Sequence, residues 1–193
     1  MGIENERKLL LDVQKSDQLF KDLKNSVQEH GVEFFDITQG YLTGSGRIRH
    51  AVPHVPTMSV KEAFYFTFKT KVQGATVELE QEISTHDYQK LFLIVKPWLI
   101  KTRAKIVQGP FTWDIDFFKT PKQGLVYLAM AEVEMPEFET HVPEIHPVLQ
   151  PYAVKWIEFG DKRFNNKNLA NMKKVQSILS QMKSITTDGT KTK

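Results

Sequence analysis

The chain has 193 residues, of which 40% are hydrophobic and 25% are charged. This composition excludes a mainly disordered chain and fits one folded domain with a sizeable core. Lysine and arginine exceed aspartate and glutamate by 26 to 23, a surplus too small to attract duplex nucleic acid through net charge. The sequence has no cysteine, which excludes disulfides, thiolate nucleophiles and cysteine metal sites.

The sequence contains no segment typical of a membrane span or a targeting signal. Its longest apolar runs, Leu91–Val95 and Leu125–Ala131, are far shorter than the roughly 18 residues that suggest a bilayer span. The first residues carry acids where a signal peptide carries bases and then an apolar run. We therefore expect a cytoplasmic protein without a membrane partner, with one domain over residues 1–183 and a flexible polar tail at 184–193.

Strand and helix patterns alternate along the chain and indicate an α+β fold. Helical periodicity predicts one helix from Asp17 to His30, a second from Ser84 to just before Pro97, and a third from Asn166 to Met182. Two-residue alternation predicts seven strands, at residues 2–11, 37–50, 63–73, 76–83, 100–108, 112–119 and 125–135.

One face of each predicted strand is charged, because residues two apart in a strand lie on the same face. Most of these rows carry a single sign, and only the first strand mixes signs. The rows are Glu4, Glu6 and Lys8; Arg47 and Arg49; Lys69 and Lys71; Glu78, Glu80 and Glu82; Lys101, Arg103 and Lys105; Asp114 and Asp116; and Glu132 and Glu134.

Two arrangements can accommodate these rows. In the first, an ordinary sheet packs its apolar face on the core and exposes the charges to water, as most alternating strands do. Rows of a single sign argue against it, since a solvated face usually mixes signs. In the second, the sheet closes into a barrel with the charges inside and the apolar rows outside, under the amphipathic helices.

A closed barrel of this kind predicts a phosphate-binding channel. Clustered bases in an enclosed space repel one another unless an anion such as a phosphate chain lies between them. Clustered carboxylates can meet the same phosphates through bridging Mg²⁺ or Mn²⁺. Bases, acids and metal ions together support phosphoryl transfer to water.

At this point the sequence resembles the CYTH, or triphosphate tunnel metalloenzyme, superfamily, and looks most like its short bacterial tripolyphosphatase branch. The resemblance covers most of the chain and rests on motifs in the family's order. These are Glu-x-Glu-x-Lys at Glu4, Glu6 and Lys8; QGYL at 39–42; Arg47-x-Arg49; a strand ending in Lys69; ELEQEI at 78–83; KTR at 101–103; WDIDFF at 113–118; AEVEM at 131–135; and GDKRFNNKNLA at 160–170.

The resemblance implies an eight-stranded antiparallel closed β-barrel, or tunnel, with a C-terminal helix near one mouth. It implies a catalytic dyad of Lys8 and Tyr41 that positions or deprotonates the attacking water, for which Lys8 needs a lowered pKa. The implied phosphate-binding residues are Lys8, Arg47, Arg49, Lys69, Lys101, Arg103 and Arg163. The implied ligands for the divalent ions are Glu4, Glu6, Glu132 and Glu134, with Asp116 and Glu82 as weaker candidates.

The resemblance further implies metal-dependent hydrolysis of a triphosphate, with inorganic tripolyphosphate as the leading substrate. Nucleoside triphosphates, thiamine triphosphatase activity and class IV adenylyl cyclase chemistry remain alternatives, as does a non-catalytic protein that sequesters nucleotides or polyphosphate. A homodimer is left open. Two stretches, 50–62 and 136–151, are longer than in short family members, so substrate access is expected to differ.

Overall fold

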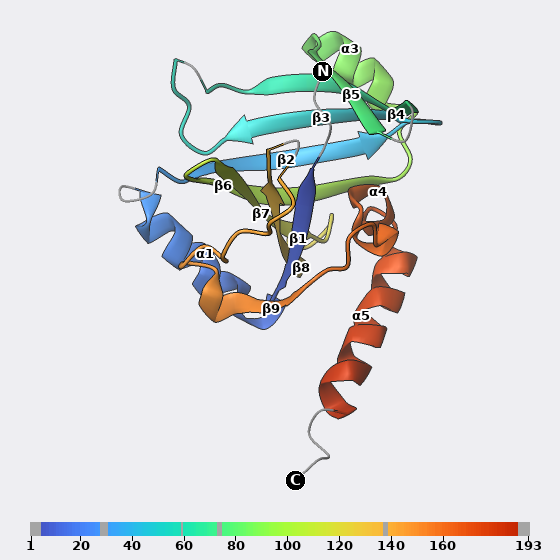
Figure 1. Ribbon diagram of the computed structural model, residues 1–193. Helices are drawn as coiled ribbons and strands as arrows, with labels where there is room; N and C mark the ends of the chain where they lie inside the picture. The colour runs from blue at the N-terminus through green and yellow to red at the C-terminus, as the bar shows by residue number, and fades with distance from the viewer. Residues whose placement is uncertain (1–4, 28–30, 59, 73–74, 137–138, 189–193) are drawn as a thin grey trace.

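The computed structural model describes residues 5–27, 31–58, 60–72, 75–136 and 139–188 (Figure 1). It confirms an α+β fold in which one antiparallel sheet carries a few helices. The strands are β1 (Glu6–Leu11), β2 (Glu33–Tyr41), β3 (Gly46–Pro53), β4 (Ala63–Val72), β5 (Ala75–Glu82), β6 (Trp98–Gln108), β7 (Phe111–Lys119), β8 (Val126–Glu134) and β9 (Ala153–Trp156).

The sheet is not the closed eight-stranded barrel that the resemblance implies. Its described residues form nine strands in the order β5-β4-β3-β2-β6-β7-β8-β1-β9, and among them the outer strands β5 and β9 pair only with β4 and β1, respectively. The ninth strand extends the edge beside β1, where a closed barrel would pair β1 with another long strand. The sheet nevertheless curls, so that β3, β4 and β5 lie over β6, β7, β8 and β1 (Figure 1).

Two strand predictions need correction. The segment 37–50, predicted as one strand, forms the end of β2 and most of β3, because the chain reverses between them at Gly44, whose φ is +83°. Glycine adopts this left-handed conformation without steric cost. The four residues of β9 were not predicted, since so short a strand shows little alternation.

The predicted helices are present with altered bounds. They are α1 (Ser16–Asn25), α3 (Thr85–Phe92), α4 (Asn166–Leu169) and α5 (Met172–Asp188), with short 3₁₀ turns η1 (Val13–Lys15), η2 (Gln150–Tyr152) and η3 (Lys162–Phe164). Ser84 caps α3 by accepting a hydrogen bond from the backbone NH of Asp87, as its sequence predicts. The third predicted helix is divided into α4 and α5, and α5 extends past Ser184 into the predicted tail.

The outer face of the sheet is apolar and is covered by helices. Helix α1 buries Leu19 and Leu23 against side chains from β1, β6, β7 and β8, among them Leu9 and Trp113. Helix α3 contributes Tyr88 to a smaller core beside Ile48 of β3. The apolar rows therefore point outward onto helices, which leaves the charged rows on the inner face.

The inner face of the sheet changes from charged to apolar along the strands. Leu10 and Phe118 lie two positions after Lys8 and Asp116, and Leu99 lies two positions before Lys101; all three are buried in a second core. This core, here called the end core, also contains side chains from η3, α4 and α5 and consists of Leu10, Leu99, Phe118, Leu128, Met130, Ile157, Phe164, Leu169, Val175 and Ile178. The C-terminal helices thus pack against the apolar end of the inner face.

Within the described ranges, we find no helix whose length and hydropathy would suffice to cross a bilayer.

Candidate functional site

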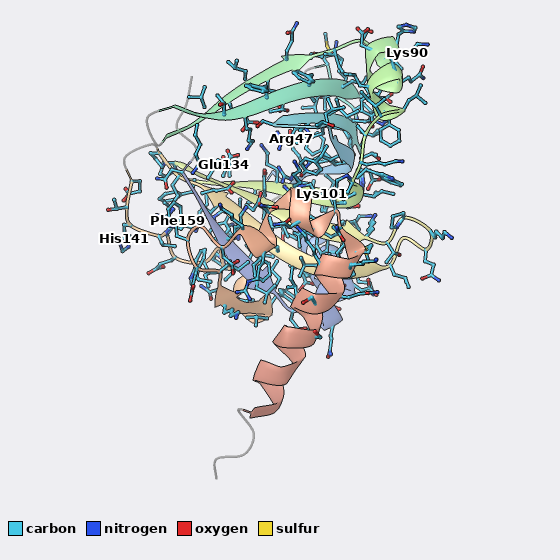
Figure 2. All side chains as sticks on the ribbon, turned by 90° about the vertical axis from the view of Figure 1, so that its right-hand side faces the viewer. Arg47, Lys90, Lys101, Glu134, His141 and Phe159 are labelled. Atoms are coloured by element: carbon cyan, nitrogen blue, oxygen red, sulfur yellow. The ribbon has the colours of Figure 1, made fainter. Side chains whose placement is uncertain are left out.

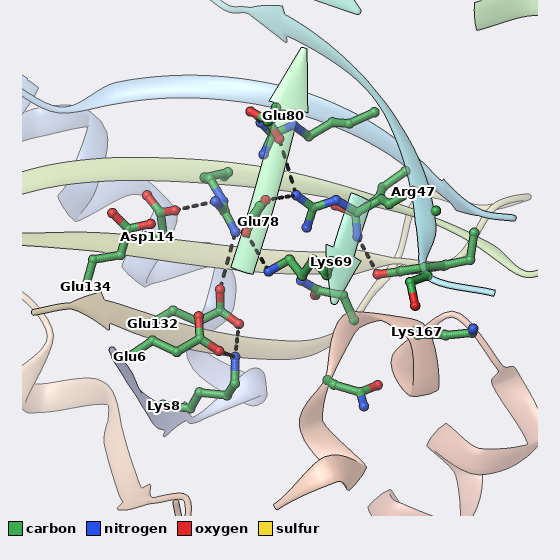
Figure 3. Close-up of a pocket in the computed structure, with 18 of the residues that line it drawn as sticks. Glu6, Lys8, Arg47, Lys69, Glu78, Glu80, Asp114, Glu132, Glu134 and Lys167 are labelled. Atoms are coloured by element: carbon green, nitrogen blue, oxygen red, sulfur yellow. Dashed lines mark hydrogen bonds and ion pairs between the residues drawn. The ribbon is translucent and has the colours of Figure 1, made fainter. Parts of the chain in front are cut away.

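The curled sheet partly surrounds a cavity of about 770 Å³, which is lined mostly by charged and polar residues (Figure 3). Each of the strands β1 to β8 contributes at least one side chain to it, which explains why residues distant in the sequence meet there. Seen from the side of α4, Arg47 lies across the interior from Glu134 and Lys101 (Figure 2). The lining residues are Glu6, Lys8, Gln39, Tyr41, Gly44, Ser45, Gly46, Arg47, Arg49, Lys69, Glu78, Glu80, Arg103, Lys105, Asp114, Glu132, Glu134, Asn165, Asn166 and Lys167.

Basic residues of β3 and β4 meet acidic residues of β5 on one side of the cavity. Arg47 Nη2 lies 2.9 Å from Glu78 Oε1 and 3.3 Å from Glu80 Oε2. Arg49 Nη2 lies 2.7 Å from Glu80 Oε1, and Lys69 Nζ lies 2.8 Å from Glu78 Oε2. The hydrogen bond and charge of Lys69 lower the pKa of Glu78 although its partial burial opposes this.

Two donors on this side have no hydrogen-bond partner among the residues that the structure describes. The Nε atoms of Arg47 and Arg49 are buried, and no acceptor among the described residues reaches either of them. Burial and the neighbouring cations Arg47 and Arg103 lower the pKa of Arg49, although Glu80 opposes the shift. Buried unsatisfied donors are costly in proteins, so this geometry favours an anion that would accept from both arginines.

Lys8 lies between two carboxylates on the other side. Its Nζ is 2.7 Å from Glu6 Oε1 and also donates to Glu132 of the neighbouring strand. Burial alone would lower the pKa of Lys8, but the carboxylates of Glu132 and Glu6 outweigh it and raise the pKa. The lowered pKa that a basic Lys8 needs is therefore not seen, and Lys8 is an ammonium in this state.

Tyr41, the predicted partner of Lys8, also lines the cavity. Its hydroxyl accepts a hydrogen bond from Gln39 Nε2, two residues earlier on the same face of β2. Burial raises the pKa of Tyr41, and the positive charge of Arg47 only partly offsets this. Tyr41 is therefore a neutral phenol that can donate a hydrogen bond.

A buried cluster lies behind the cavity wall. Arg103 binds Asp116 through two hydrogen bonds of 2.7 Å, and Lys101 Nζ lies 2.5 Å from the same carboxylate. Burial and the charge of Arg103 lower the pKa of Lys101 to about 8. The cations Arg103 and Lys101 lower the pKa of Asp116 against the effect of burial. Lys101 and Asp116 do not line the cavity, and they position Arg103, which does.

Four carboxylates line the part of the cavity beside β7, β8 and β1: Asp114, Glu132, Glu134 and Glu6. Burial and the negative charge of Asp114 raise the pKa of Glu134. Asp114 Oδ1 is buried without a hydrogen-bond donor among the described residues, although Lys105 Nζ lies 3.7 Å away. Carboxylate oxygens with incompletely neutralised charge suit a hard cation such as Mg²⁺ or Mn²⁺.

The carboxylates are not arranged as a complete metal cage. No three His, Cys, Asp or Glu side chains within the described part of the chain are close enough together to hold an ion. Mg²⁺ usually takes one or two protein carboxylates and completes its shell with water and phosphate oxygens. The donor set therefore fits an ion that binds together with a phosphate ligand.

The structure brings together most of the residues that the resemblance implies. Lys8, Tyr41, Arg47, Arg49, Lys69, Arg103, Glu6, Glu132 and Glu134 all line the one cavity. Glu4 lies outside the described residues.

Two further implied residues do not reach the cavity. Glu82 is exposed near the end of β5, beyond the lining residues Glu78 and Glu80. Arg163 is exposed in η3 and binds Asp161, with Nη2 2.7 Å from Oδ2. The lining residues Glu78, Glu80, Lys105 and Asp114 were not predicted as site residues, although they belong to the same alternating rows; Lys167 carried no comparable signal.

Comparisons with known proteins identify one curated relative over nearly the whole chain. An inorganic triphosphatase from Acetivibrio thermocellus is 29% identical over 173 residues, which cover 88% of this chain and 94% of the relative. This relative confirms the resemblance to the triphosphate tunnel superfamily. No family model matches the chain.

Two solved structures show weak likenesses to this chain. The PH1012 protein from Pyrococcus horikoshii OT3 is 18% identical, with a TM-score of 0.43, over 72% of this chain and 80% of that one. A conserved hypothetical protein from Pyrococcus furiosus is 15% identical, with a TM-score of 0.41, over 68% of this chain and 78% of that one. Scores this low add no support to the fold or to a function.

Proposed function

From the confirmed resemblance, we propose that this protein is a triphosphatase that hydrolyses inorganic triphosphate. Water attacks the terminal phosphorus, the bond to the bridging oxygen breaks, and orthophosphate and pyrophosphate leave. The observation that carries this proposal is the pair of buried Nε donors of Arg47 and Arg49, which no described residue binds, in a cavity whose described lining includes seven basic side chains. A chain of phosphates supplies acceptor oxygens for these donors.

In this proposal Arg47, Arg49, Lys69, Arg103 and Lys8 hold the phosphate oxygens. The arginines are suited to the role because a planar guanidinium can donate to two phosphate oxygens at once. Lys8 acts here as an ammonium, since Glu132 and Glu6 raise its pKa. Removal of the water proton by Lys8 and Tyr41 remains a prediction of the resemblance, and the pKa directions of both groups oppose it in this state.

We further propose that Mg²⁺ or Mn²⁺ binds on the side of Glu6, Glu132, Glu134 and Asp114. When bound, a divalent ion neutralises charge on the phosphate oxygens and lowers the pKa of a coordinated water. The residues of the chain would orient the phosphates toward this side. Glu4 is part of the implied ligand set, next to Glu6 in the same row.

The cavity lining favours an inorganic over an organic triphosphate. Tyr41 is the one aromatic side chain in the lining formed by the described residues, and its hydroxyl is bound by Gln39. A base or thiazole ring would need aromatic or apolar surface to stack on. Thiamine triphosphatase and adenylyl cyclase chemistry are therefore less well supported than hydrolysis of inorganic triphosphate.

The test is to incubate the pure protein with tripolyphosphate, ATP or pyrophosphate, each with Mg²⁺ or Mn²⁺, and to measure released orthophosphate and any cyclic product. We expect rapid release from tripolyphosphate, slower release from ATP, and loss of turnover in EDTA that added metal restores. Tight binding of tripolyphosphate without release under all metal conditions would contradict the proposal and favour a sequestering protein. Activity that is unchanged in EDTA would contradict the metal requirement.

A further inference from the structure

Lys167 of α4 is a cavity base that lies within the motif at 160–170 but was not predicted as a site residue. It lines the cavity together with its neighbours Asn165 and Asn166 and with the turn Gly44–Gly46 between β2 and β3 (Figure 3). Its Nζ donates a hydrogen bond of 3.2 Å to the carbonyl oxygen of Gly44. Lys167 therefore connects the C-terminal segment to the β2–β3 turn at the border of the cavity.

The charge environment of Lys167 differs from that of the other bases in the lining. Each of those six, Lys8, Arg47, Arg49, Lys69, Arg103 and Lys105, lies within 4 Å of a carboxylate. For Lys167, no carboxylate of the described ranges lies at ion-pair distance, and its acceptor is a neutral carbonyl. An arriving anion therefore competes with a carboxylate for the charge of each of the other bases, but only with a neutral carbonyl for that of Lys167.

Asn166 provides a second, independent observation in the same corner. Its Oδ1 is buried and receives no hydrogen bond from the part of the chain that the structure describes. No bond on this oxygen holds the amide in its present orientation, so a rotation can direct Nδ2 toward an anion. Among the described residues, therefore, the ammonium of Lys167 has no carboxylate partner and the amide oxygen of Asn166 receives no hydrogen bond. Both residues line the same cavity.

We infer that Lys167, assisted by Asn166, binds a phosphate group of the substrate. The C-terminal segment then contacts the substrate through Lys167 and not through Arg163. The inference rests on the proposed function for the identity of the anion. Exchange of a neutral carbonyl for a phosphate oxygen strengthens the hydrogen bond of the ammonium. Arg163 would first have to leave its two-fold contact with Asp161 outside the cavity.

The test compares Lys167→Met, Lys167→Arg and Lys173→Met with the wild-type protein. Lys173 is the matched control, since it is an exposed lysine near the start of α5 that does not line the cavity. Calorimetry measures the Kd of imidotriphosphate, whose P–N–P bridges resist hydrolysis, with and without Mg²⁺ at constant ionic strength. Phosphate release from tripolyphosphate is measured in parallel.

We expect Lys167→Met to raise the Kd about tenfold, the loss of one charge-assisted hydrogen bond. Lys167→Arg should restore most of the affinity, and Lys173→Met should bind as the wild type does. Equal affinities of Lys167→Met and Lys173→Met would overturn the inference even if tripolyphosphate is hydrolysed. Weakened binding by Lys167→Met in a protein that releases no phosphate would support the inference while the proposed hydrolysis fails. No binding by the wild-type protein would overturn both.

Discussion

Lys8 and Glu132 face each other across the paired strands β1 and β8, and their side chains form an ion pair inside the cavity. The same register places Glu6 opposite Glu134. The N-terminal motif and the acidic motif near residue 133 therefore belong to one site because two strands pair in a single register. Other charges of the cavity are brought together by such cross-strand neighbours, as with Lys69 and Glu78 or Lys105 and Asp114.

Replacement of Lys8 by methionine should lower the rate of phosphate release at least about a hundredfold, the loss seen when a group that stabilises developing charge is removed. Arg7→Met is the control, because Arg7 lies on the opposite face of β1. Its Cζ atom lies 4.3 Å from the centroid of the Phe159 ring. Steady-state kinetics with tripolyphosphate measure the effect. Circular dichroism checks the fold, since Glu132 loses its buried partner. A wild-type rate in folded Lys8→Met protein would remove Lys8 from the site.

Thr67 is expected to position Arg47. The Thr67 hydroxyl is buried, accepts a hydrogen bond of 3.2 Å from Arg47 Nη2 and donates one of 2.8 Å to Glu80 Oε2. Thr67→Val keeps the shape of the side chain but removes both bonds, so KM for tripolyphosphate should rise about tenfold, equivalent to roughly one charged hydrogen bond.

Two variants distinguish positioning by Thr67 from general loss of stability. Thr67→Ser retains the hydroxyl and should restore KM. Thr70→Val changes an exposed threonine on the outer face of the same strand and should leave KM unchanged. If Thr67→Val and Thr70→Val have the same KM, Thr67 does not act on Arg47.

Gly40 is required by the close approach of Val95. A Cβ atom at position 40 would lie 2.1 Å from Val95 Cγ1, which is buried beneath α3. Gly40→Ala should therefore lower the free energy of unfolding by about 1–3 kcal/mol, the usual cost of overpacking. Denaturant unfolding of Gly40→Ala, Val95→Ala and the double variant tests this. An equal cost of Gly40→Ala in both backgrounds would exclude Val95 as the cause.

The hydroxyl of Tyr152 joins η2 to α1 by donating a hydrogen bond to Asp22. This bond, assisted by burial, raises the pKa of Tyr152 to about 12. Because the folded-state pKa lies above the unfolded value of about 10, the bond should contribute fully below pH 10 and be lost as the pH rises from 10 to 12.

Tyr152→Phe should thus lower the free energy of unfolding by about 1–2 kcal/mol at pH 7, as expected for a hydrogen bond to a charged acceptor. The difference from wild type should shrink above pH 10. Urea unfolding at pH 7, 9 and 11 measures it, and Asp22→Asn completes a double-mutant cycle. A difference that stays constant to pH 11 would show that the bond is not its source.

The alternation of residues was sufficient to predict which face of each strand carries charge. Lys8, Arg47, Arg49 and Lys69 share the inner face because every second side chain of a strand points the same way. The single sign of most rows indicated that this face is enclosed. The sequence could therefore predict the α+β class and the polar interior.

Alternation could not predict how deep a side chain lies. Lys101 belongs to the same row as Arg103 and Lys105 but is 1% exposed, since the end core covers this part of β6. The position of that core depends on how α4 and α5 dock on the sheet. This docking is a tertiary contact that no local sequence pattern predicts. For the same reason the resemblance implied that Arg163 binds phosphate, whereas in the docked segment it is Lys167 that lines the cavity.

Strand pairing also depends on contacts that local patterns do not contain. Residues 37–50 alternate almost without interruption, so the reversal at Gly44 was hidden within an apparent strand. The closure of the barrel depends on which strands pair at the two edges, and the pairing of β9 with β1 leaves the sheet open.

The switch from charged to apolar positions along the inner face restricts how these strands can change in length. In β1, Lys8 faces the cavity, Leu10 enters the end core, and Leu9 and Leu11 enter the core under α1. Deletion of one residue within β1 would exchange the two faces of the strand, so that Lys8 would point into the apolar core or a leucine would point into the charged cavity. Natural variants should therefore gain or lose residues in the connection 54–62, where the backbone forms no strand, and keep the spacing within β1 and β8 unchanged.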